Sequence, residues 1–268
     1  MPMPDDTVPG KIAAVILDWA GTTVDFGSCG PAAVFQRIYA SRGVPITAAE
    51  AREPMGRAKR DHIAAIAAMP RVATAWRERF GTACDGPDVD AMYAEFLPLQ
   101  KQVLADHSEL IPGVVDAVEA LRRQGIPIGS TTGYTRLLMD VVEPLAAEQG
   151  YVPDCVCCAD EVAAGRPEPL LNALAANRLG VDLGRQVIVV DDTLVGIEAG
   201  VRAGCTTVGV AASGNLMGLS RAETDRLAPA ERAARLAAIS EQFRKAGADL
   251  VIESVADLPG ALRQASLL

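Results

Sequence analysis

The stretch ILDWAGTTVD, residues 16–25, decides the fold of this chain. A hydrophobic run from Ile12 to Leu17 ends abruptly on Asp18, and small residues follow. A buried strand of a parallel sheet has this pattern when it delivers a carboxylate to the C-terminal edge of the sheet, where open α/β sheets bind ligands. The stretch therefore predicts a parallel α/β fold with a functional aspartate at the sheet edge.

The composition limits the classes of function. The 268 residues are 50% hydrophobic, which suffices for one large domain or two smaller ones. A net charge of −9 argues against nucleic acid or an anionic membrane as a partner. No apolar run of the sequence approaches the roughly 20 residues that span a bilayer, and the acidic start MPMPDD has no signal-peptide pattern. We therefore expect a soluble, cytoplasmic protein.

The six cysteines show no spacing of a disulfide framework in a chain of this length. The cluster CVCC at residues 155–158 suggests zinc, but zinc needs further ligands and the only histidines are His62 and His107. We favour the interpretation that these cysteines are buried apolar residues.

Five segments have the pattern of strands that feed helices. They lie at 13–17, 127–132, 187–190, 206–210 and 250–252. Helical patterns lie between them, for example at 114–124, which Gly125 closes, and at 194–203. This alternation predicts a doubly wound parallel sheet.

Residues 25–105 interrupt the alternation, because they show helical periodicity and no strand pattern. Thr47 and Glu50 have the spacing of a capping box, which predicts a helix that starts at Thr47. Residues 57–68 predict another helix, and Asp88 is a suitable N-cap for a third.

The helical insert is large enough to form a domain of its own. We expect an α/β core domain at 1–24 and 106–268 and an all-helical cap domain at 25–105. Since the insert follows the first strand directly, the cap would lie over the carboxyl edge of the sheet.

Groups suited to phosphorus chemistry follow several of the predicted strands, and parallel strands bring their carboxyl ends to one edge. Asp18 is a carboxylate that can attack phosphorus and form a covalent intermediate. Asp191 and Asp192 follow another strand and offer hard oxygen ligands for Mg²⁺. Adjacent aspartates also often cap the next helix, so Asp192 or Thr193 has this alternative role.

Three further residues suit the binding of phosphoryl oxygens. Thr132 offers a hydroxyl group, and Gly133 exposes backbone N–H groups. Arg166, which precedes Pro167, is a permanent cation that can orient and neutralise an anion.

The set Asp18, Thr132, Arg166 and Asp191-Asp192 resembles, in order and spacing, the four signatures of the haloacid dehalogenase (HAD) superfamily. The resemblance implies that Asp18 is the nucleophile. In the ester-cleaving members, a second aspartate two residues further on protonates the departing alkoxide. This chain has Ala20 at that position, and alanine cannot donate a proton.

Ala20 indicates a leaving group other than an alkoxide. A phosphorus–carbon bond fits, because its leaving group is a carbanion that needs an electron sink, such as the protonated imine of a lysine with an aldehyde. Lys59 is the candidate, and His62 lies three residues on, on the same helix face, where it can shuttle protons. Burial and cations such as Arg57 would lower the pKa of Lys59 and release the neutral amine. Alternatively, Lys59 lies with Arg57 and Arg60 on a solvated helix face.

Four longer motifs resemble one HAD family closely, the phosphonoacetaldehyde hydrolases. They are DWAGTTVD at 18–25, PMG at 54–56 followed by Lys59 and His62, GSTTGYT at 129–135, and AGRP at 164–167. The resemblance implies a Mg²⁺-dependent homodimer that converts phosphonoacetaldehyde and water into acetaldehyde and phosphate. It also implies that Lys59 forms the imine.

The same resemblance implies that the metal lies on Asp18, the backbone carbonyl of Ala20, and Asp192. Asp191 would support these ligands, and whether it also contacts the metal stays open. Some HAD enzymes carry a further aspartate later in this loop, where this chain has Gly196, so Asp191 and Asp192 must suffice.

Met55 and Tyr134 would shape the substrate pocket, whereas Ser28 and Cys29 are assigned no role.

Two other functions are alternatives. One is a HAD phosphatase or phosphomutase that acts on a phosphate ester, and Ala20 argues against it. The other is a non-catalytic HAD protein that binds a phosphorylated ligand, which would have no reason to retain all four signatures.

Overall fold

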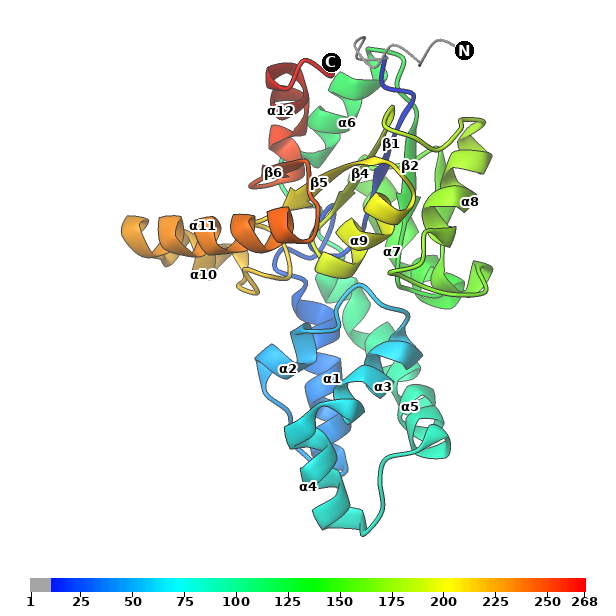
Figure 1. The fold of residues 1–268 in the computed structure, drawn as a ribbon, viewed down its shortest axis with the longest axis vertical. Coiled ribbons are helices and arrows are strands. Elements are labelled where there is room, and N and C mark those ends of the chain that lie inside the picture. Colours follow the sequence, from blue (N-terminus) through cyan, green and yellow to red (C-terminus); the bar gives the residue numbers. More distant parts are fainter. Residues whose placement is uncertain (1–10) are drawn as a thin grey trace, which may run out of the picture.

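The structure of the protein is a computed structural model that describes residues 11–268. The chain start at 1–6, where we expect no signal peptide, lies outside the described residues. Figure 1 shows an α/β part at the top and a block of helices below it. Among residues 11–268, every helix is too short or too polar to span a lipid bilayer.

The α/β part is built on one parallel sheet of six strands in the order β3-β2-β1-β4-β5-β6. Its strands are β1 (Ala14–Leu17), β2 (Ile128–Thr131), β3 (Cys155–Cys157), β4 (Val187–Asp191), β5 (Thr206–Val210) and β6 (Leu250–Ile252). β1 lies between β2 and β4, with Leu17 opposite Ser130 and Val190. The ends of these three strands therefore meet at one point of the carboxyl edge.

Helices cover both faces of the sheet. They are α6 (Val114–Arg122), α7 (Arg136–Glu148), α8 (Leu170–Leu179), α9 (Leu194–Arg202), α11 (Pro229–Lys245) and α12 (Leu258–Gln264). The α/β part also contains the short helix α10 (Arg221–Arg226), which precedes α11, and 3-10 turns at Ala105–His107, Ala159–Glu161 and Val255–Asp257. Successive residues of β1 point to opposite faces: Val15 and Leu17 pack with α6, α7 and α12, whereas Ile16 packs with α8. The predicted doubly wound parallel sheet is confirmed.

The block of helices contains α1 (Cys29–Ser41), α2 (Ala48–Arg52), α3 (Lys59–Ala68), α4 (Pro70–Phe80) and α5 (Gly86–Leu104). It has a hydrophobic core of its own, drawn from residues 32–96, separate from the cores of the α/β part. At its centre, the ring of Phe35 stacks between His62 and Phe96, with centroids 3.8 and 4.5 Å away. The block adjoins the carboxyl edge of the sheet (Figure 1).

Several element boundaries test the sequence predictions. The five predicted strands agree with the structure to within one residue at each end, and the capping box of Thr47 is present. The prediction of Asp88 as an N-cap was wrong. α5 starts after Asp85, and Asp88 is the acid of the capping box three residues on, because Pro87 needs no hydrogen-bonded N–H in the first turn. The edge strand β3 was not predicted.

Candidate active site

Three carboxylates meet at the carboxyl edge of the sheet. Asp18 follows β1 directly, Asp191 ends β4, and Asp192 comes next. All three side chains are buried, and one oxygen of each lies within 4.8 Å of the others. The parallel pairing of β1 with β4 produces this cluster, since it brings the two strand ends side by side.

Arg166 connects two of these carboxylates. Its Nη1 lies 2.6 Å from Oδ1 of Asp18 and 3.0 Å from Oδ2 of Asp191. Its Nη2 donates a hydrogen bond of 2.7 Å to the hydroxyl of Thr131 at the end of β2. The buried guanidinium is thus fixed from three neighbouring strands, next to the side chain of the expected nucleophile.

The buried charges at this edge do not balance. Burial raises the pKa of Asp18 to about 7, since the attraction of Arg166 does not offset the burial and the negative charge of Asp191 adds to the rise. The pKa of Asp192 is also well above its usual value, because of burial and the charge of Asp18. A divalent cation would keep these carboxylates ionised, and carboxylate and carbonyl oxygens are the ligands of hard cations. The residues present therefore fit a metal ion.

Small residues and a backbone amide hold Asp192 in place. Gly21 has a φ of +86°, and a Cβ there would overlap with the Asp192 carboxylate. The backbone N–H of Asn215 donates a hydrogen bond of 2.7 Å to Oδ2 of Asp192. The side chain of Asn215 accepts from Arg52, at 3.2 Å, and donates to its carbonyl, so a residue of the helical block is linked to the carboxylate.

Lys59 reaches the same edge from the helical block, because the loop before α3 packs tightly onto the α/β part. A Cβ on Gly56, which has a φ of +93°, would overlap with the hydroxyl of Thr193. A Cβ on Gly133 would lie 2.8 Å from the carbonyl oxygen of Arg57. Glycine on both sides allows the two backbones to approach, and Lys59 begins α3 immediately after this contact.

The amine of Lys59 lies in an enclosed environment. Its side chain is buried, with Nζ 4.8 Å from the ring centroid of Tyr134 and 5.8 Å from that of Phe35. Burial lowers the pKa of Lys59 to about 8, with Asp18 opposing the shift and Arg166 adding to it. Lys59 therefore does not lie on a solvated helix face, although its neighbour Arg60 is exposed.

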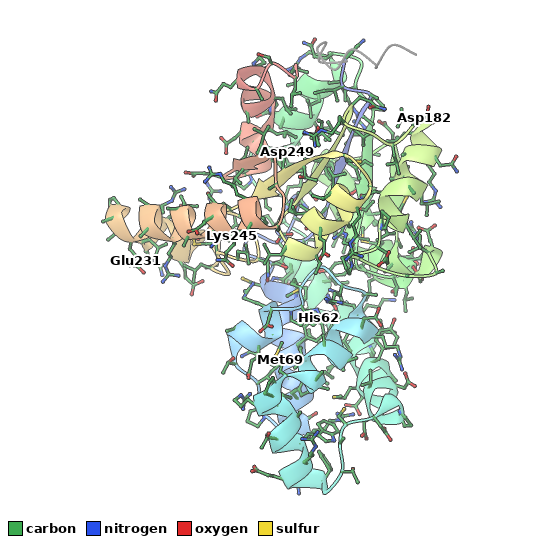
Figure 2. The ribbon with its side chains drawn as sticks, viewed as in Figure 1. His62, Met69, Asp182, Glu231, Lys245 and Asp249 are labelled. Atoms are coloured by element: carbon green, nitrogen blue, oxygen red, sulfur yellow. The ribbon has the colours of Figure 1, made fainter. Side chains whose placement is uncertain are left out.

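His62 is buried one helical turn beyond Lys59, in the half of the helical block nearer the α/β part (Figure 2). Its Nε2 lies 2.9 Å from the carbonyl oxygen of Ala51, and its buried Nδ1 has no partner among the described residues. Burial and the positive charge of Lys59 lower the pKa of His62 well below its usual value. The imidazole is therefore neutral, with Nε2 as the donor and Nδ1 free to accept.

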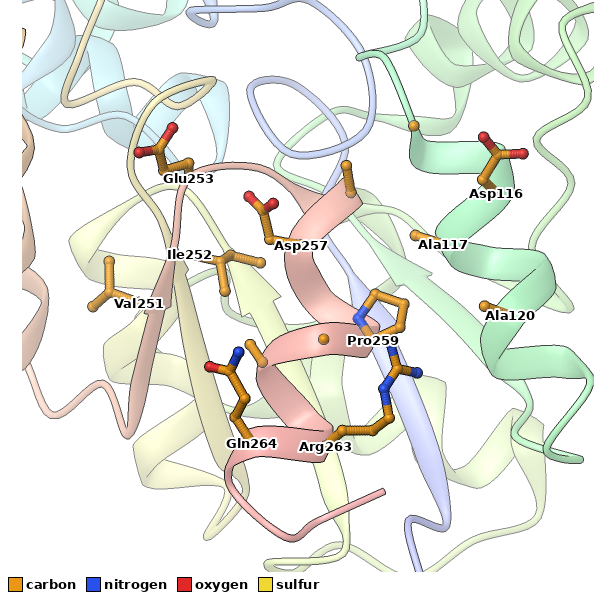
Figure 3. Close-up of a pocket in the computed structure, with 14 residues that line it drawn as sticks. Asp116, Ala117, Ala120, Val251, Ile252, Glu253, Asp257, Pro259, Arg263 and Gln264 are labelled. Carbon is orange, nitrogen blue, oxygen red and sulfur yellow. The ribbon is translucent and has the colours of Figure 1, made fainter. Parts of the chain in front are cut away.

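The predicted residues of the sheet edge and those of the helical block line one small cavity. Its volume is about 20 Å³, which is room for about one water molecule. The predicted site residues that line it are Asp18, Ala20, Met55, Lys59, Thr132, Gly133, Tyr134, Arg166 and Asp192. His62 and Asp191 do not line it, and Asp191 lies 3.0 Å from Arg166, which does. A larger open pocket, of about 780 Å³, lies between α6, β6 and α12 and contains none of these residues (Figure 3).

Comparison with known proteins identifies the family. Residues 12–204 match the model of the haloacid dehalogenase-like hydrolases. The chain is 49% identical, over 92% of each sequence, to a phosphonoacetaldehyde hydrolase of Paraburkholderia xenovorans. It is 47% identical to one of Hahella chejuensis, over 94% of this chain and 86% of that one. The chain belongs to the phosphonoacetaldehyde hydrolase family.

A solved structure supports membership of the phosphonoacetaldehyde hydrolase family. The crystal structure of a phosphonoacetaldehyde hydrolase-like protein from Oleispira antarctica superposes with a TM-score of 0.95 at 40% identity. The match covers 98% of this chain and 96% of that one. The relation between helical block and sheet is therefore shared with a close relative.

One residue that lines the cavity could not be recognised as a site residue from the sequence. Ser28 is buried in a left-handed conformation, with a φ of +49°, and its hydroxyl has no partner among residues 11–268. It faces the cavity beside Pro31 at the start of α1. A serine after a glycine in a loop resembles any turn, so only the fold reveals this position.

Proposed function

We propose that this chain hydrolyses the phosphorus–carbon bond of phosphonoacetaldehyde to give acetaldehyde and phosphate. The observation that carries the proposal is that a buried aspartate, Asp18, and a buried lysine, Lys59, line one cavity, with Ala20 where an acid would stand. The similarity to phosphonoacetaldehyde hydrolases over most of the chain supports the same substrate.

The reaction begins at Lys59. Its neutral amine adds to the aldehyde carbon, water leaves, and the product is an imine that carries a proton on nitrogen. At pH 7, a lysine with a pKa of about 8 is neutral in about one molecule in ten, against fewer than one in a thousand at the usual pKa. Burial of Lys59 therefore favours this step.

Asp18 then acts on phosphorus. Its carboxylate forms the new oxygen–phosphorus bond while the phosphorus–carbon bond breaks, and that electron pair moves into the iminium to give an enamine. Arg166, Thr132 and the backbone N–H of Gly133 hold the phosphonate oxygens and stabilise the charge that develops on them. Water hydrolyses the aspartyl phosphate, and protonation of the enamine at carbon followed by hydrolysis releases acetaldehyde.

We infer that Mg²⁺ is held by Asp18, the carbonyl of Ala20, and Asp192. When bound, the ion supplies positive charge between the carboxylates and the anionic substrate. The support is the excess of buried negative charge and the set of hard oxygen donors at this edge.

His62, Met55 and Tyr134 serve the lysine. We propose that Nδ1 of neutral His62 accepts and returns protons during imine formation and hydrolysis, through water admitted when the cavity opens. Met55 and the ring of Tyr134 exclude other water from the amine, which keeps its pKa low.

The cavity is too small for the substrate, so we propose that the cap opens to admit it. The cap is residues 25–105, and the core is 1–24 and 106–268. Two chain segments connect them, and His107 of one lies 2.9 Å from the carboxylate of Asp25 in the other.

The family resemblance also supports a homodimer, which analytical ultracentrifugation tests. A cytoplasmic location is a further proposal, and fractionation of the source cells tests it.

The test of the function is phosphate release from phosphonoacetaldehyde by the purified protein, with and without Mg²⁺. We expect turnover that requires the metal and yields one acetaldehyde per phosphate. A folded protein that released phosphate from simple phosphate monoesters but not from phosphonoacetaldehyde would overturn the proposal and return the phosphatase alternative.

A further inference from the structure

The segment 213–219, which follows β5, packs between the carboxylate of Asp192 and the helical block. On one side, a Cβ on Gly214 would lie 2.7 Å from Cβ of Asp192. On the other side, a Cβ on Gly218, which has a φ of +64°, would lie 3.0 Å from Nε of Arg52. Glycine at both positions lets the backbone approach both neighbours. The segment therefore contacts a proposed metal ligand and the cap at the same time.

Within this segment, Asn215 joins Arg52 to Asp192. Its side-chain Oδ1 accepts a hydrogen bond of 3.2 Å from Nη1 of Arg52, and its Nδ2 donates one of 3.1 Å to the carbonyl oxygen of the same residue. Its backbone N–H donates one of 2.7 Å to Oδ2 of Asp192. An amide side chain carries both a donor and an acceptor, so asparagine can make this reciprocal pair, whereas an ionised aspartate could only accept. The cap therefore fixes the residue whose N–H orients the carboxylate.

Arg52 is itself held by other residues of the cap. It ends α2 and is half-buried, and its Nη1 also donates to the carbonyl oxygens of Gly27, at 2.6 Å, and Ser28, at 3.2 Å. The guanidinium thus belongs to the cap, and the two hydrogen bonds between Arg52 and Asn215 cross to the core. Opening of the cap, which the proposed function requires, must break these two bonds.

We propose that Arg52 and Asn215 are positioning residues that couple closure of the cap to binding of the metal. Closure places Arg52 against Asn215, and Asn215 then holds its N–H against the carboxylate of Asp192. A residue that orients a metal ligand raises the affinity for the metal. Because coupling between two equilibria is reciprocal, the bound ion favours the closed cap in turn. The inference rests on the proposed function for cap opening and for the metal, but not for the substrate.

Binding of Mn²⁺ without substrate, measured by electron paramagnetic resonance of the free ion, tests the coupling. The variants are Asn215→Ala, Arg52→Gln and the double variant. Arg77→Gln and Asn177→Ala are the matched controls, because they make the same changes at exposed positions on α4 and α8.

We expect Asn215→Ala and Arg52→Gln each to weaken Mn²⁺ binding about tenfold, the lower end of the effect of residues that orient metal ligands, because the backbone N–H itself remains. The direction of the change in Arg52→Gln is informative. Loss of a positive charge near a metal site would by itself tighten the binding of a cation, whereas loss of the contact weakens it. The double variant should bind Mn²⁺ about as well as the single variants, because all three remove the same contact. The two controls should bind as the wild-type protein does.

Hydrogen exchange of the wild-type protein is a second measurement and needs no variant. The backbone N–H of Gly27 donates a hydrogen bond of 2.7 Å to the carbonyl oxygen of Ser213, so its exchange reports on the contact between the cap and the segment 213–219. Saturating Mn²⁺ should slow this exchange about tenfold, the same factor that the variants lose in affinity. In Asn215→Ala, Mn²⁺ should slow it less.

Four results would overturn the proposal. Wild-type Mn²⁺ affinity in Asn215→Ala, or tighter binding by Arg52→Gln, would leave the pair as a structural contact only. Exchange at Gly27 that Mn²⁺ did not change would exclude the coupling. A wild-type protein that bound no Mn²⁺ would overturn it together with the proposed metal. In contrast, a wild-type protein that bound Mn²⁺ with these effects but did not turn over phosphonoacetaldehyde would support the coupling and contradict only the proposed function.

Discussion

The sheet edge and the helical block contribute to the cavity in different ways. The sheet supplies Asp18, Thr132 and Asp192 directly from strand ends, where backbone pairing sets their positions. The helical block supplies Lys59 through a loop whose position depends on contact between Gly56 and Thr193. In the mechanism that we propose, the sheet edge would bind the phosphorus group and the helical block would bind the aldehyde, which is a division of labour between the two parts.

Removal of the nucleophile should have the largest effect on turnover. Asp18→Asn leaves the core packed but removes the attacking oxygen, and we expect phosphate release to fall by about 10⁴-fold or more. The imine on Lys59 should still form, because the aldehyde chemistry lies on the cap. Phosphate assays together with borohydride trapping check both parts, and activity near wild type would remove Asp18 from the nucleophile role.

Removal of the amine should be nearly as severe. Lys59→Arg keeps a positive charge in the cavity but cannot form an imine, so phosphate release should fall by about 10³-fold or more and trapping should disappear. Lys245→Arg makes the same change at an exposed position on α11 (Figure 2) and should leave both unchanged. Full turnover by Lys59→Arg would contradict the role of the cap in the chemistry.

Disturbance of the docking contact should have an intermediate effect. Gly56→Ala would push the loop away from Thr193, and a displacement of about 1 Å of a reacting group costs about 10²-fold in rate. Gly81→Ala is the matched control, because Gly81 also has a positive φ, of 77°, but nothing near its Cβ. Its expected cost is about 1 kcal/mol of stability, seen in urea unfolding, and no change in kcat. Equal kcat values for the two variants would remove the docking argument.

The pH dependence should have the smallest effect and should separate the two parts. The neutral amine of Lys59 becomes scarcer below its pKa of about 8, so the rate of borohydride trapping should fall as the pH decreases from 8 to 6. Turnover should fall over the same range. In Asp18→Asn, the loss of a neighbouring negative charge that favours the ammonium form should move the trapping midpoint to lower pH. A trapping rate independent of pH between 6 and 8 would contradict the lowered pKa of Lys59.

The same division explains what the sequence could predict. The strand ends could be predicted from the sequence. A hydrophobic run that stops on Asp18 or on Asp191 has few other interpretations once the parallel sheet is assumed. The fold class and five of the strands followed from this pattern. β3 was not predicted, because its three residues, two of them cysteines, are too few to show a periodic pattern.

Contacts between distant segments could not be predicted. The sequence suggested that Arg57 or another cation lies near Lys59, but it could not identify Arg166, which comes from the other side of the cavity and contributes to the lowered pKa. The hydrogen bond from His62 to the carbonyl of Ala51 and the backbone contact of Asn215 with Asp192 likewise depend on tertiary packing. Such contacts leave no local pattern, whereas a strand end does.

The most direct test of the division of labour is the mass of the adduct that borohydride traps on Lys59 in the presence of phosphonoacetaldehyde. The account predicts that Asp18→Asn carries a phosphonoethyl group on Lys59, because the imine forms but the phosphorus–carbon bond stays intact. The wild-type protein should also carry an ethyl group, which remains after cleavage. An Asp18→Asn protein without an adduct on Lys59, or with the ethyl group there, would contradict the account.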